Sequence, residues 1–168
     1  MSDVPDRVDV PLVDAAVVFI NQTVAEKVST GSLEIGAYLL KTFFNNDIEL
    51  ATSKDSNKPV SYSALCSRPD LAVSRWTLSR MVRVAAQEKF LASKRVRTTG
   101  LSYVQRMELI KLPNDDRKVE LVRHCIKEGL ATRDLIPLIN QEYRKSVPPP
   151  KPVSPAMAAN GTCGSFSR

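Results

Sequence analysis

The chain has 168 residues, of which 43% are hydrophobic and 25% charged, a balance that excludes wholesale disorder. The first residues contain neither a basic nor an apolar signal region, and no apolar run is long enough to cross a bilayer. The three cysteines are an odd number and widely separated, which suits a reducing compartment. We therefore expect a cytoplasmic protein that makes no membrane contact.

The charge is divided unevenly along the chain. Residues 1–60 carry five Lys and Arg against nine Asp and Glu, whereas residues 61–145 carry seventeen against nine. A basic segment beside an acidic one is typical of a polyanion-binding module joined to a second element.

Apolar residues with helical spacing predict an N-terminal helical hairpin within residues 1–50. The first helix runs from Val10 to Val28, and its predicted apolar face is Leu12, Ala15, Ala16, Phe19, Ile20 and Val24. Ser32 is placed to cap the second helix, from Leu33 to about Asn45, with Ile35, Leu39, Leu40 and Phe43 on its apolar side. Gly36 inside that helix indicates close packing against a neighbouring helix.

The loop Thr52–Pro59 marks a boundary, and a basic helical domain is predicted over residues 60–145. A short helix from Ser61 to about Ser67 precedes Pro69, and Ser74 caps a long helix from Arg75 to about Ala92. Three more helices follow: Tyr103–Lys111 capped by Ser102, Asn114–Glu128 with Pro113 in its first turn and Gly129 after it, and Arg133–Lys145 capped by Thr132. Residues 146–168 form a Pro-rich tail that we expect to be disordered, and the predicted fold is all-α.

Residues 61–91 carry the functional signal, because they have the pattern of a helix-turn-helix. Ala64 and Leu65, then Val73, then Leu78 and Val82 are the small or apolar positions that allow the two helices to cross closely. A capped second helix directs free N–H groups and a positive dipole end toward a phosphate. The predicted DNA-binding residues are Ser74, Arg75, Thr77, Ser79, Arg80, Arg83, Lys94, Arg95 and Arg97. Alternatively, Arg95 and Arg97 are simply a solvated basic face.

Residues 60–145 resemble the central DNA-binding region of ParB-type partition proteins and their nucleoid-occlusion relatives. The resemblance is carried by Ser61 to Arg83, by Leu101-Ser102-Tyr103-Val104-Gln105-Arg106 with Lys111-Leu112-Pro113, and by Glu128-Gly129-Leu130 through Leu135. It implies duplex DNA contacts at Ser74, Arg75, Thr77 and Arg80. The family's upstream nucleotide-binding domain has no counterpart in residues 1–50, so no nucleotide-dependent clamp is implied. The connection from Ser67 to Val73 is longer than the family's turn, which affects the expected angle of the second helix.

No constellation of catalytic, metal-binding or cofactor-binding residues stands out. The single histidine, His124, adjoins Cys125, but neighbours on a helix point about 100° apart. Asp115 and Asp116 are expected to complement a helix dipole. Trp76, the only tryptophan, is expected in the core, with stacking on a partner as the alternative.

The sequence therefore predicts a non-enzymatic bacterial DNA-binding protein, nucleoid-associated, that acts in transcription regulation or DNA partition. The N-terminal helices are left for a homodimer or a protein partner. The alternative is a non-catalytic helical adaptor whose basic face binds an acidic protein or RNA.

Overall fold

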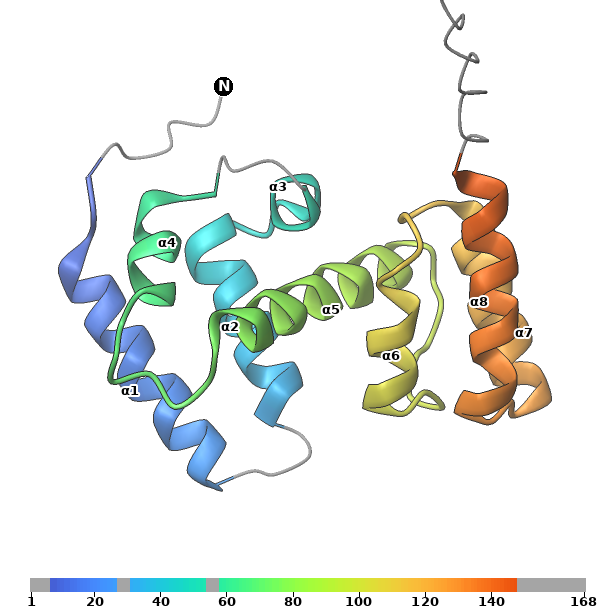
Figure 1. Ribbon diagram of the computed structural model, residues 1–168, viewed down its shortest axis with the longest axis horizontal. Coiled ribbons are helices and arrows are strands. Elements are labelled where there is room, and N and C mark those ends of the chain that lie inside the picture. The colour runs from blue at the N-terminus through green and yellow to red at the C-terminus, as the bar shows by residue number, and fades with distance from the viewer. Residues whose placement is uncertain (1–6, 27–30, 54–57, 148–168) are drawn as a thin grey trace, which may run out of the picture.

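A computed structural model describes residues 7–26, 31–53 and 58–147, and every regular element within these ranges is a helix (Figure 1). The helices are α1 (Val10–Glu26), α2 (Gly31–Phe44), α3 (Ile48–Thr52), α4 (Val60–Cys66), α5 (Arg75–Ser93), α6 (Tyr103–Leu109), α7 (Asp116–Glu128) and α8 (Thr132–Ser146). The all-α prediction is confirmed. The predicted tail lies outside the described residues, except that α8 continues to Ser146.

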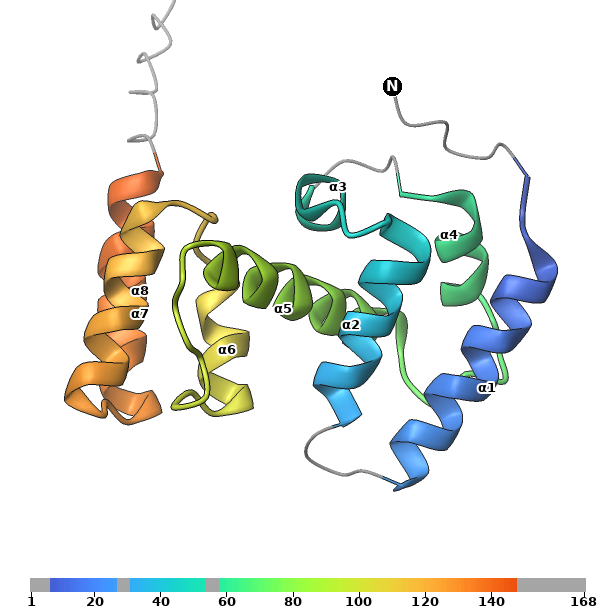
Figure 2. The same ribbon diagram turned by 180° about the vertical axis from the view of Figure 1, so that it is seen from behind.

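The N-terminal hairpin is confirmed, since α1 and α2 pack together and run in opposite directions (Figures 1 and 2). The predicted apolar face of α1 is partly wrong: Val13 and Val17 are buried, whereas Ala15 is exposed. Ser32 does not precede α2 as its cap, because the helix already begins at Gly31.

Helix α5 is the central element, and it packs mainly on α2 and α3. The close approach predicted at Gly36 is confirmed, because this glycine lies against the backbone of Met81 in α5. In Figures 1 and 2, α5 extends from the α1–α4 helices toward α6, α7 and α8.

The buried side chains form two clusters, and α5 contributes to both. The first, the N-terminal lobe, joins α1 to α4 with α5 from Leu78 to Ala86. The second, the C-terminal lobe, joins the end of α5 from Leu91 onward with α6, α7 and α8. The division therefore falls within α5 and differs from the predicted boundary at residues 52–59, because α4 and α5 share their core with the acidic N-terminal helices. The core residues of those helices are consequently buried within the chain, whereas Val10 and Val18 of α1 are exposed.

Side-chain caps define most helix starts. Ser102 and Gln105 form a capping box at α6, and Gly129 ends α7 in the left-handed conformation at φ 61°, both as predicted in position. Besides Ser32, two predictions at helix starts are wrong. Asp115 caps α7, so that Pro113 precedes the helix, and α8 begins at Thr132 itself without a side-chain cap. The short helix α3 was not predicted: it lies between the predicted end of the second helix near Asn45 and the predicted loop that begins at Thr52.

Candidate nucleic-acid interface

The connection between α4 and α5 is held against α1 by polar side chains. The Asn21 amide donates to the Asp70 carbonyl oxygen at 2.8 Å and accepts from the Ala72 N–H at 2.7 Å. Arg68 bonds both carboxylate oxygens of Asp70 at 2.8 Å and Asp14 Oδ1 at 2.7 Å. Because these contacts draw the connection toward α1, it does not cover the start of α5.

The prediction that α4 and α5 cross closely is wrong, because each helix packs mainly on other helices. Leu65, Leu78 and Val82 are buried in one cluster, as predicted, but α4 packs mainly on α1 while α5 packs mainly on α2 and α3. The long connection that distinguished this segment from the ParB-type pattern allows this separation.

Helix α5 begins with a capped and exposed first turn. Ser74 Oγ accepts from the Thr77 N–H at 3.2 Å, which confirms the predicted cap, and it also lies 2.9 Å from Thr77 Oγ1. The side chains of Ser74, Arg75, Thr77 and Arg80 are exposed, and Ser79 is half-buried. Within the described residues, neither Arg75 nor Arg80 has a carboxylate partner.

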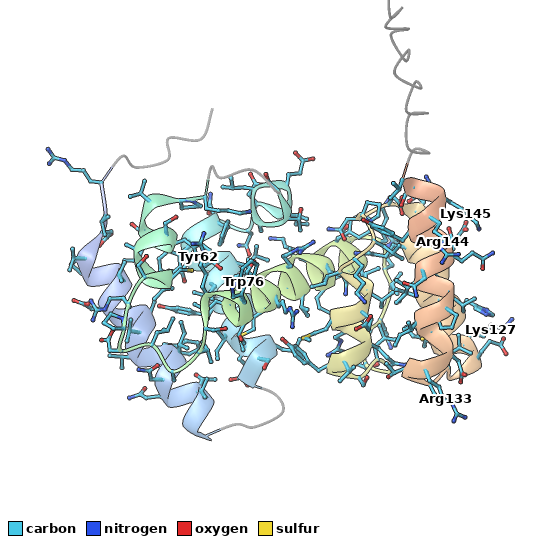
Figure 3. The ribbon with its side chains drawn as sticks, viewed as in Figure 1. Tyr62, Trp76, Lys127, Arg133, Arg144 and Lys145 are labelled. Carbon is cyan, nitrogen blue, oxygen red and sulfur yellow. The ribbon has the colours of Figure 1, made fainter. Side chains whose placement is uncertain are left out.

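Trp76 lies in this first turn with 80% of its surface exposed, so the prediction that it belongs to the core is wrong. The side of α5 that faces α2 and α3 carries Leu78, Met81 and Val82, and Trp76 stands outside that side. Figure 3 shows Trp76 where α5 begins, far from the labelled basic residues of α7 and α8. A large exposed aromatic ring is unusual and indicates a contact surface.

The charges of Arg75 and Arg80 affect the pKa values of two neighbouring groups, Cys66 and Tyr103. Burial raises the pKa of the Cys66 thiol at the end of α4, and the Arg75 guanidinium partly opposes that rise. Burial likewise raises the pKa of Tyr103, against a hydrogen bond with Ser32 and the charge of Arg80. The charge of Arg75 therefore acts on the end of α4, and that of Arg80 on the first residue of α6.

The other predicted DNA-binding residues are not brought to this end of α5. Arg83 is half-buried, and its Nη2 donates to the Ile110 carbonyl oxygen at 3.3 Å. Lys94, Arg95 and Arg97 are exposed at the opposite end, where Lys94 pairs with Asp116 at 3.0 Å. At 1.5 Å of rise per residue, about 28 Å separates the two ends of α5. The nine residues thus form two groups and one isolated arginine.

His124 and Cys125 are neighbours on α7. His124 is exposed and Cys125 buried, so the two side chains do not form a pair. Over residues 7–26, 31–53 and 58–147, no group of three or more metal-ligating side chains occurs. None of the helices described is long and apolar enough to cross a membrane.

Sequence reasoning missed Lys118, whose side chain is only 1% exposed. A signal was present in the spacing: Lys118 precedes Leu121 by three residues and Val122 by four, and so lies on the apolar stripe of α7.

Comparison of the chain with protein-family models, with curated proteins and with solved structures gave no match. The ParB-type resemblance accordingly stays a prediction.

Proposed function

We propose that the chain binds duplex DNA through the first two turns of α5, in a role such as transcription regulation or DNA organisation. The observation that carries the proposal is the exposed pair Arg75 and Arg80, which have no carboxylate partner in the described residues and flank an exposed Trp76. By contrast, Arg68 is fully engaged in holding the connection.

The chemistry of this end of α5 suits a nucleic acid. An arginine can donate two parallel hydrogen bonds to a phosphate or to the O6 and N7 atoms of guanine. The first N–H groups of a helix favour an anion, and no acidic residue lies in the first turn of α5. Since the hydroxyls of Ser74 and Thr77 bond each other, the two arginines supply the principal donors.

Trp76 provides a direct test, because it is the only tryptophan of the chain. Adding random-sequence duplex should change its fluorescence, with micromolar or tighter affinity that weakens steeply as salt is raised. The double variant Arg75→Ala/Arg80→Ala should lose most of the affinity. It should also reduce the slope of log K against log salt by about 1.8 in magnitude, at about 0.9 per phosphate contact.

The matched control is Arg133→Ala/Arg144→Ala, which removes the same charge from exposed positions on α8 (Figure 3). This variant should bind nearly as wild type, apart from a small long-range effect at low salt. An equal loss of duplex affinity in the two double variants would contradict the proposal. So would a Trp76 fluorescence that does not change when duplex is added.

The exposed Trp76 also suits the second candidate, an adaptor that binds RNA, because aromatic rings stack on unpaired bases. A single strand and a duplex of the same sequence separate the candidates. Preference for the single strand would favour RNA, and indifference to both would favour an acidic protein partner.

A further inference from the structure

A cavity of about 380 Å³ lies where the two lobes meet, and Trp76 is not among its lining residues. Its walls come from the end of α3, the middle of α5, residues 110–114, α7 and the last turn of α8. Three of the lining residues, Arg83, Lys111 and Lys118, are basic, and none is acidic. The volume falls within the range of small-molecule sites.

Lys118 is the buried cation of this cavity. Its Nζ donates to Gln87 Oε1 on α5 and to Asn114 Oδ1, each at 2.9 Å. An ammonium group has three N–H donors, and the third finds no acceptor among the residues that the structure describes. A buried ammonium left short of one acceptor is costly, so an anion in the cavity would complete its coordination.

Arg83 adds a second set of donors to the cavity from α5, one turn before Gln87. Only its Nη2 is engaged, at the Ile110 carbonyl oxygen, and no carboxylate of the described residues pairs with it. Lys111 is exposed at the rim and already pairs with Glu108. The cavity therefore offers a guanidinium and an ammonium that converge without a carboxylate between them.

Two carboxylates lie near Lys118 but outside this cavity. Asp115 and Glu142 line a smaller neighbouring hollow together with Arg117 and Lys118 itself, and each carboxylate has another basic partner, Arg117 or Lys145. Burial lowers the pKa of Lys118 to about 7; Asp115 opposes this shift and Arg83 adds to it. Tyr143 lines the cavity from α8, and His124 does not line it.

We propose that this cavity binds a small oxyanion of the phosphate class, with Lys118 and Arg83 as its ligands. The proposal is independent of DNA binding. A small phosphate can enter a concave site walled by five chain segments, whereas a duplex presents its phosphates on a convex surface.

The test uses the full chain with sulfate and inorganic phosphate as probes, by calorimetry at low ionic strength. We expect saturable binding with a dissociation constant of roughly 1 mM or below. Lys118→Met and Arg83→Gln should each weaken it at least about tenfold, since each removes a charged hydrogen bond. The controls Lys127→Met and Arg133→Gln, at exposed positions outside the cavity, should leave it unchanged.

Sulfate also tests the role of Lys118 without any variant, because its charge stays constant near neutral pH. Its binding should weaken about tenfold between pH 6 and pH 8 as the ammonium loses its proton. Failure to saturate, equal binding by cavity and control variants, or binding independent of pH would overturn the proposal. Displacement of bound sulfate by duplex DNA would assign the cavity to nucleic-acid phosphates and overturn it as well.

Discussion

Gly36 on α2 and Met81 on α5 are in backbone contact: a Cβ on Gly36 would lie 2.3 Å from the Met81 carbonyl oxygen and 2.8 Å from its carbonyl carbon. Only glycine allows this approach, because the obstructing atoms belong to a helix backbone and cannot rotate away. The crossing fixes α5 on the N-terminal lobe, and α5 in turn presents both the Trp76 end and the cavity wall.

Gly36→Ala should therefore destabilise the fold, although alanine has the higher helix propensity. We expect a loss of about 2 kcal/mol in the free energy of unfolding, measured by urea denaturation, because overpacking outweighs the propensity gain of about 1 kcal/mol. Gly100→Ala is the control, since a Cβ there would be in ordinary contact with the Ile126 side chain, 3.6 Å from Cγ2 and 3.9 Å from Cγ1. A Gly36→Ala variant as stable as wild type would contradict the crossing described here.

Ser74→Ala should loosen the first turn of α5. Loss of the bond to the Thr77 N–H should cost about 1 kcal/mol of unfolding free energy. Because Trp76 lies in the same turn, its fluorescence anisotropy should also fall. Ser93→Ala, which removes a hydroxyl bonded to the Phe90 carbonyl oxygen at the other end of α5, should leave the Trp76 anisotropy unchanged. If both variants change it equally, the effect does not come from the cap.

Asn21→Ala should release the connection that precedes α5. Two hydrogen bonds are lost, so we expect about 1–2 kcal/mol of destabilisation. The more specific measurement is hydrogen exchange at the Ala72 amide, whose acceptor is the Asn21 side chain. Exchange there should accelerate in Asn21→Ala and stay slow in the control Gln22→Ala, which changes an exposed neighbour on α1. Unchanged exchange in both variants would show that Asn21 does not hold the connection.

The sequence predicted well what is decided locally. The caps at Ser74 and Ser102 and the end at Gly129 depend on a few adjacent residues, and the structure has them all. The buried face of α1 was harder to predict from the sequence. Its own apolar residues are spread around the helix, so several choices of buried face satisfy the helical period. Which helices α4 and α5 contact depends on distant parts of the chain, and periodicity does not report it.

The candidate site divides in the same way. Exposure of Arg75, Thr77 and Arg80 followed from the cap and the helical period, whereas Trp76 was misplaced because residue type was given more weight than position. Lys118 was missed for the same reason: its charge suggested a solvated position, although its spacing placed it on the apolar stripe.

Lys118 should also make stability depend on pH. Burial lowers its pKa from an ordinary 10.5 to about 7 in the folded chain. Below pH 7 the lysine is charged in both states, so the cost of burying the charge is fully present and constant. Between about pH 7 and pH 10.5 the unfolded chain holds the proton and the folded chain does not, so stability rises with pH.

The measurement is the difference in unfolding free energy between wild type and Lys118→Met, taken from urea denaturation at pH 6, 7, 8 and 9. The variant cancels the contributions of other titrating groups, such as the half-buried Cys66 thiol, which are common to both proteins. We expect the difference to be flat near pH 6. Above pH 7 it should shift in favour of wild type by up to about 1.4 kcal/mol per pH unit. Lys127→Met, which alters an exposed lysine of the same helix, should show no such shift. A difference independent of pH up to 9 would mean that Lys118 keeps its proton in the folded chain, so its two acceptors, Gln87 and Asn114, would suffice to hold the charge.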